Sequence, residues 1–218
     1  MRKFLLVLLI CLAGPAVFAQ QGTLRNADGT VEIKHPGQTA FVPAKAGDAV
    51  PAKAIVSTGF KSSAVIAVGN SLITVRPLTR LSLEEMIQSQ NSETVNLQLQ
   101  AGRVRVEVKP PAGTKTNLTV QTPSATASVR GTEFESDTFN TTVNEGVVEF
   151  HGQSGGIVLI GSGDTGRIDN QGRAQDPQET FESELRVKAP AGMGETGALN
   201  SGPAMPPSDI IVFNFVFD

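Results

Sequence analysis

The chain has 218 residues, enough for one domain with tails or at most two small domains, and its composition and charge are those of a globular protein. With 39% hydrophobic and 18% charged residues, it is too apolar for a disordered chain and too often interrupted by polar residues for a membrane bundle. The 18 Lys and Arg against 21 Asp and Glu residues give a net charge of −3, which argues against nucleic acid as a partner because phosphate backbones select basic surfaces.

The N-terminus has the three-part layout of a secretory signal peptide. Met1–Lys3 is basic, Phe4–Leu12 is apolar, and the small residues that follow end at Ala19. This pattern predicts a signal peptide over residues 1–19, with cleavage after Ala19. The mature protein is therefore expected in the periplasm or outside the cell.

Two other interpretations of this segment were weighed. A lipoprotein anchor would use Cys11, but Cys11 lies inside the apolar run and follows Ile10 rather than a small residue. An uncleaved anchor is disfavoured because the run from Phe4 to Phe18 is broken by Gly14-Pro15 and is shorter than the roughly 20 apolar residues of a spanning helix. The sequence therefore predicts a mature chain with no membrane span and no cysteine.

Between residues 23 and 169, short apolar–polar alternations are separated by glycines, which is typical of an all-β domain. Gly69-Asn70 between two such runs predicts a hairpin of strands 63–68 and 71–75. The run 103–108 alternates throughout and places Arg103, Arg105 and Glu107 on the solvent face. Further strands are expected at 30–34, 80–83, 95–99, 117–121, 127–129, 134–138, 147–150 and 157–160. Short strands at such intervals predict a sandwich, a barrel or a β-solenoid.

The C-terminal part has a different character. Residues 176–188 are compatible with one short helix, with Asp176 as its cap and Pro177 in its first turn. Residues 189–208 are rich in Gly and Pro and are expected to form a flexible linker. Residues 209–218 are mostly apolar and predict a strand that docks on this domain or on a partner.

No constellation of catalytic or metal-binding residues emerges from the sequence. His35 and His151 are the only histidines, and neither has nearby cysteines or a tight carboxylate cluster, so no zinc site is predicted. No Ser or Thr is spaced with a base and an orienting partner. We therefore expect no enzyme activity, no cofactor and no metal.

The stretch Arg130-Gly131-Thr132-Glu133-Phe134 is the most informative motif. The small residues 124–128 before it allow two backbones to approach closely, and Gly131 permits a turn or bulge between strands. Arg130 and Glu133 could then pair across that bulge. The motif is interpreted as a structural corner rather than a catalytic site.

This motif, following Thr122-Pro123, resembles the hallmark of the FecR domain. Further similar segments lie at 47–48, 55–64, 69–75, 99–104 and 143–148, so the resemblance covers about residues 30–168. FecR-type regulators combine a cytoplasmic tail that handles a sigma factor with a periplasmic, β-solenoid-like part that senses an outer-membrane transporter. The resemblance implies an extracytoplasmic β module, and because only Met1–Lys3 precede the apolar run, the sigma-regulating tail is not expected here.

The sequence therefore predicts an all-β domain of β-solenoid-like or sandwich type at 23–169. Its predicted role is a non-catalytic protein–protein interaction or scaffolding module that binds envelope proteins. One alternative is an envelope signalling component related to FecR regulators. A glycan-binding protein or an envelope hydrolase is a further alternative, although the absence of Trp and Tyr removes the usual platforms for stacking sugars.

Overall fold

A computed structural model describes residues 21–177, apart from the side chain of Arg130. The predicted signal peptide at 1–19, the linker at 189–208 and the apolar segment at 209–218 lie outside the described residues. So does the predicted helix at 176–188, except for its first two residues.

The described region consists of eighteen strands in two nine-stranded sheets. Sheet 1 contains, in spatial order, β18 (Ala174–Gln175), β17 (Thr165–Ile168), β14 (Asn140–Glu145), β13 (Glu133–Asp137), β10 (Arg103–Val108), β7 (Ser71–Val75), β6 (Ser63–Val68), β1 (Gln21–Asp28) and β4 (Ala49–Pro51). Sheet 2 contains β16 (Ile157–Gly161), β15 (Val147–Gly152), β12 (Ala125–Arg130), β11 (Lys115–Gln121), β9 (Ser92–Ala101), β8 (Arg80–Gln88), β5 (Ala54–Thr58), β2 (Val31–Lys34) and β3 (Val42–Pro43).

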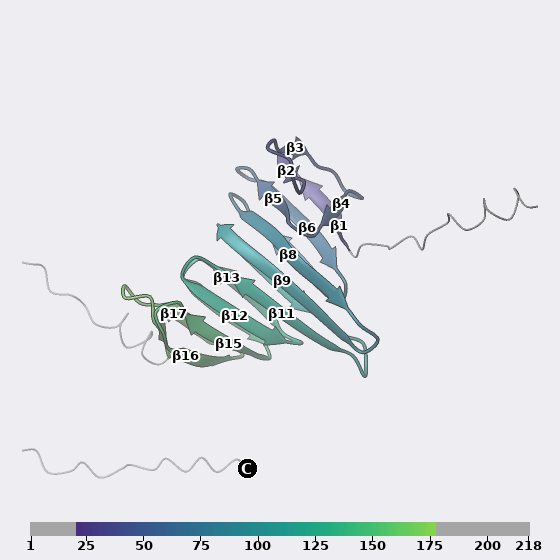
Figure 1. The fold of residues 1–218 in the computed structure, drawn as a ribbon. Helices are drawn as coiled ribbons and strands as arrows, with labels where there is room; N and C mark the ends of the chain where they lie inside the picture. Colours follow the sequence, from purple (N-terminus) through teal and green to yellow (C-terminus); the bar gives the residue numbers. More distant parts are fainter. Residues whose placement is uncertain (1–20, 178–218) are drawn as a thin grey trace, which may run out of the picture. The chain divides into compact units, whose positions relative to one another are not determined.

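The chain alternates between the two sheets as it advances along them (Figure 1). The hairpins β6–β7 and β13–β14 lie in sheet 1, whereas β8–β9, β11–β12 and β15–β16 lie in sheet 2. Within residues 21–177, the strand order of each sheet has two ends that do not meet, so neither sheet closes into a barrel. The all-β prediction is confirmed, with a two-layered arrangement that coils in the manner of a solenoid.

Strand pairing agrees closely with the alternation in the sequence. The hairpin at Gly69-Asn70 forms with Val68 opposite Ser71, and β10 spans the predicted 103–108. β8 and β9 are longer than predicted, and β1 was not predicted because a bulge between Leu24 and Asn26 interrupts its alternation. Within residues 21–177, no helix is long and apolar enough to cross a membrane.

The core lies between the sheets and is filled by alternate residues of the strands. Along β6, β10 and β11, every second side chain is buried and its neighbours are more exposed. Phe134 on β13 and Phe150 on β15 are the largest fully buried side chains and come from opposite sheets. Since burial of one such side chain stabilises a fold by about 1.5–3 kcal/mol, the shared core holds the two sheets together.

Glycines with positive φ mark places where the chain crosses from one sheet to the other. Gly102 (φ 88°) links β9 to β10, and Gly146 (φ 91°) links β14 to β15. Each packs against a buried threonine, Thr79 for Gly102 and Thr132 for Gly146. Residues 102–106 (Gly-Arg-Val-Arg-Val) and 146–150 (Gly-Val-Val-Glu-Phe) both place a glycine before an alternating strand, so the two crossings are built in the same way.

Candidate functional site

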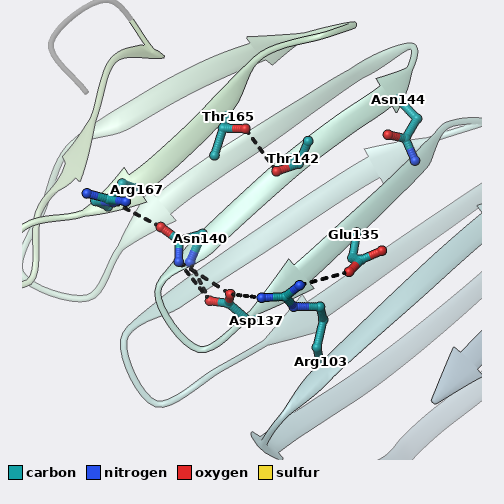
Figure 2. Close-up of a pocket in the computed structure, with 8 residues that line it drawn as sticks. All are labelled: Arg103, Glu135, Asp137, Asn140, Thr142, Asn144, Thr165 and Arg167. Atoms are coloured by element: carbon teal, nitrogen blue, oxygen red, sulfur yellow. Dashed lines mark hydrogen bonds and ion pairs between the residues drawn. The ribbon is translucent and has the colours of Figure 1, made fainter. Parts of the chain in front are cut away.

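The outward-facing side chains of four neighbouring strands of sheet 1, β10, β13, β14 and β17, form a polar surface together with Arg76, which follows β7. We call this surface the charged platform. Because side chains alternate along a strand, the charged positions of β10 and β13 share one face. Their register places Arg103 opposite Asp137 and Arg105 opposite Glu135. The platform consists of Arg76, Arg103, Arg105, Glu133, Glu135, Asp137, Asn140, Thr142, Asn144, Thr165 and Arg167. A hollow of about 420 Å³ lies on it, and Figure 2 shows the eight residues that line the hollow.

Arg103 is the centre of the ion pairs on the platform. Its guanidinium lies 3.3 Å from Glu135 through Nη1 and 3.3 Å from Asp137 through Nη2 (Figure 2). The second oxygen of Glu135 pairs with Arg76 at 3.1 Å. One arginine thus bridges two carboxylates, and one carboxylate bridges two arginines, so the charged groups hold one another in place.

Hydrogen bonds extend this network across β14 to β17. Oδ1 of Asp137 accepts the backbone N–H groups of Phe139 and Asn140 at 2.9 and 2.8 Å. The amide oxygen of Asn140 accepts from Nε of Arg167 at 3.0 Å. Farther along the same two strands, the hydroxyls of Thr142 and Thr165 lie 2.9 Å apart. The hollow is therefore bordered by charged groups on one side and by hydroxyls on the other.

On the platform, the side chain of Arg103 is more exposed to solvent than the carboxylates that it pairs with. The side chain of Arg103 is 55% exposed, whereas those of Glu135 and Asp137 are 25% and 21% exposed. At the far end of β10, the Glu107 carboxylate accepts a hydrogen bond from Lys109 and raises the pKa of that ammonium. Exposed ion pairs contribute little to stability, commonly about 0–1 kcal/mol. An ordered surface of guanidinium donors is better suited to recognising the carboxylates and carbonyls of a partner.

The predicted structural motif forms the corner between β12 in sheet 2 and β13 in sheet 1. Thr132 is buried against Gly146, and its carbonyl accepts the N–H of Val108. Phe134 is fully buried in the core. Glu133 does not need Arg130 as a partner, because its carboxylate pairs with Arg105 on the platform. The Arg130 side chain in the predicted Arg130–Glu133 pair lies outside the described part of the structure.

Replacement of Gly131 by valine is expected to destabilise the fold by about 1–3 kcal/mol, because a β-branched residue is strained in a left-handed backbone conformation. Gly131 has φ 60°, and an added Cβ would have no neighbour nearer than 3.8 Å, so the cost comes from the backbone and not from a clash. Chemical denaturation measures the change. Gly131→Asn is the control and should cost less than about 1 kcal/mol, because asparagine tolerates this conformation. Equal midpoints for the valine variant and the unmodified protein would contradict the assignment.

The histidines do not converge on a site. His35 follows β2, and His151 lies on β15 beside the carboxylate of Glu149. In sheet 2, strands β12, β11, β9, β8 and β5 separate β15 from β2. Within residues 21–177, no group of three or more His, Cys, Asp or Glu side chains is arranged to hold a metal ion.

Comparison with known proteins links part of this fold to a described family. A family model described as FecR protein matches residues 54–149, which include the corner motif and most of the platform strands. No curated protein was found to be similar to the chain.

Two solved structures were found to be similar to part of this chain. They are crystal structures, at 2.50 and 1.65 Å resolution, of a candidate anti-sigma factor from Parabacteroides distasonis ATCC 8503. Both are 14% identical to this chain, with TM-scores of 0.46 and 0.45. The matches cover 58% and 60% of this chain and 62% and 64% of the other, so less than two thirds of that protein is represented.

Proposed function

Because the chain contains a FecR domain, matched over residues 54–149, we propose that it is an exported, non-catalytic module that binds another protein in the cell envelope through the charged platform. The observation that carries this proposal is the arginine–carboxylate network on the outer face of sheet 1, centred on Arg103. The basic–apolar–small pattern that ends at Ala19 supports export.

The chemistry of the platform favours a protein over other ligands. Its arginines and carboxylates are mixed, so it matches a partner surface with both signs of charge rather than a uniformly charged polymer. The planar guanidinium of Arg103 is held by two carboxylates and is still half-exposed, which leaves it able to donate to a partner. A prearranged surface of this kind loses little side-chain entropy on binding.

Arg103→Glu is expected to weaken capture of the partner at least about tenfold, because it places a third carboxylate beside Glu135 and Asp137 and removes the bridging cation. The full-length protein, carrying an affinity tag, would be cross-linked in its native envelope, and the captured proteins quantified. The intact mass of the recovered protein would correspond to a chain that begins just after Ala19.

Arg25→Glu is the matched control, because it makes the same charge change at an exposed residue of β1, in the same sheet but away from the platform. Equal capture by both variants, with both still folded, would contradict a role for the platform. Retention of Met1 in the recovered protein would contradict export. Turnover of an envelope substrate that is lost on substitution of His35 or His151 would replace the binding role with an enzymatic one.

A second candidate function is an envelope signalling component related to FecR regulators, which the family match favours. The same capture experiment separates the two functions. A transporter or a signalling protein among the Arg103-dependent partners supports the signalling role, whereas structural envelope proteins support scaffolding.

A further inference from the structure

Three exposed apolar side chains lie in turns of the described structure. Phe60 between β5 and β6 is 74% exposed, Leu78 between β7 and β8 is 63% exposed, and Phe139 between β13 and β14 is 56% exposed. Within residues 21–177, the other large apolar side chains with comparable exposure all lie on strands. A single exposed apolar residue needs no explanation, whereas a group of them indicates an interaction site.

The strand register brings these turns to one edge of sheet 1. Ala64, near the start of β6, lies opposite Val75 at the end of β7. β10 pairs with β7, and Arg103 at the start of β10 lies opposite Asp137 at the end of β13. The turns before β6, after β7 and after β13 therefore follow one another along the same edge. We call their row of side chains the apolar edge, which consists of Phe60, Leu78 and Phe139.

The backbone holds two of these turns in strained conformations. Leu78 has φ 56° and Lys61, next to Phe60, has φ 52°, and residues other than glycine rarely adopt this left-handed region. The N–H of Leu78 donates to the carbonyl oxygen of Gly59 at 3.1 Å and so joins the two turns. A bulky residue that is kept in this conformation with its side chain in solvent does not fill the core. Such strain is common where a protein binds a ligand.

Basic side chains flank the apolar edge. Nζ of Lys61 lies 5.7 Å from the centroid of the neighbouring phenylalanine ring, and Arg76 and Arg80 stand two residues before and after Leu78. Lys61 and Arg80 are exposed, and the side chain of Arg76 is 42% exposed. One exposed carboxylate, that of Asp28, lies opposite the first residue of β6 at the same edge. The charged residues that flank Leu78 in the chain are thus basic, although the whole protein has a net charge of −3.

We propose that the apolar edge attaches the protein to the surface of a lipid bilayer, with its three side chains inserted between the headgroups. None of the three lines the hollow on the platform, and apolar side chains that project from turns suit insertion into lipid. The phosphates of the headgroups are complementary to Lys61, Arg76 and Arg80. Because Asp28 weakens that attraction, burial of the apolar side chains supplies most of the binding.

Sedimentation with vesicles tests this attachment. The full-length protein, as recovered from the envelope, would be mixed with vesicles of phosphatidylethanolamine that contain about one quarter phosphatidylglycerol, an anionic lipid. Phe60→Ser combined with Leu78→Asn is expected to weaken binding at least about tenfold, because it removes two of the inserted side chains. Both positions are exposed, and asparagine tolerates the left-handed backbone, so the fold should be unchanged.

Leu72→Thr combined with Ile87→Thr is the matched control. It removes two side chains that are 44% and 52% exposed, from the ends of β7 and β8 that lie far from the apolar edge. Binding to the vesicles should stay as in the unmodified protein.

Tryptophan fluorescence gives a second measurement, because the chain has no tryptophan of its own. The emission of a Phe139→Trp variant is expected to shift to shorter wavelength when vesicles are added, since the indole enters an apolar environment. The emission of a Leu72→Trp variant should not shift.

No binding of the unmodified protein to vesicles, or equal binding by the two double variants, would overturn the proposal. Binding that is lost on Lys61→Glu but kept by the Phe60/Leu78 variant would also overturn it, because the attraction would then be purely electrostatic. So would a dimer in light scattering that the Phe60/Leu78 variant abolishes, since a second copy would then cover the edge. The double variants leave every platform residue intact, so vesicle binding and Arg103-dependent capture can each fail separately.

Discussion

Gly102→Ala is expected to destabilise the folded protein by about 3–5 kcal/mol, since it combines overpacking with backbone strain. A Cβ at this position would lie 2.3 Å from Oγ1 and 2.5 Å from Cα of Thr79, and 2.7 Å from the carbonyl oxygen of Leu78. Two of these atoms belong to the backbone and cannot rotate away. The φ of 88° is also unfavourable for alanine.

The effect reaches beyond the glycine because Thr79 connects two strands. Its hydroxyl accepts the N–H of Arg103 at 3.0 Å and lies 3.1 Å from the carbonyl oxygen of the same residue. Displacement of Thr79 would break this contact at the start of β10, where the platform begins. Urea denaturation measures the loss, and a fall in the unfolding midpoint with an unchanged slope would identify it as lost stability.

Gly113→Ala separates strain from overpacking. Gly113 has φ 84°, but an added Cβ would meet nothing within 4 Å. This variant should therefore lose only about 1 kcal/mol, the cost of the backbone conformation. Similar losses at Gly102 and Gly113 would show that the contact with Thr79 is not important.

Phe134→Ala is expected to lose about 3–5 kcal/mol of stability, as is usual when a buried aromatic ring is removed. Phe134 is fully buried in sheet 1, between Val106 on β10 and Val143 on β14 in the pairing of the strands. The cavity left by the ring would lie directly beneath the platform. Since a typical domain has only about 5–15 kcal/mol of stability, a large shift in the unfolding midpoint should result.

Phe139→Ala is the control for this substitution. Phe139 lies five residues farther along the chain, after β13, and its side chain is 56% exposed. Its replacement should change stability by less than about 0.5 kcal/mol. Comparable effects at both positions would contradict the assignment of Phe134 to the core.

The motif at residues 130–134, at the corner between β12 and β13, could be interpreted only in part from the sequence. The sequence assigned Gly131 to a turn between strands and gave the motif a structural role, and its φ of 60° agrees with that interpretation. The sequence could not show whether glycine is needed at position 131 because a side chain would clash with a neighbour or because the backbone has a positive φ. That choice depends on the distance to Pro110, which comes from the β10–β11 connection and lies 3.8 Å from the added Cβ.

The platform was only partly visible in the sequence. The alternation of β10 placed Arg103 and Arg105 on the solvent face, and both are exposed. Glu133, Glu135 and Asp137 alternate in the same way along β13, so the complementary acidic strand was present as an unused signal. Their pairing depends on β10 and β13 being neighbours, although β11 and β12 come between them in the chain.

The sequence by itself determined the local features of this protein. The period-two alternation set the strands and their buried faces, and the glycines and Gly69-Asn70 set where strands end, because these properties depend on side chains and backbone conformations within a few residues. The tertiary structure alone decided which strands became neighbours. Alternation does not encode whether the next hairpin joins the same sheet or the opposite one. The grouping of the arginines with the carboxylates follows from that choice, as does the position of β16 at the end of sheet 2 within residues 21–177.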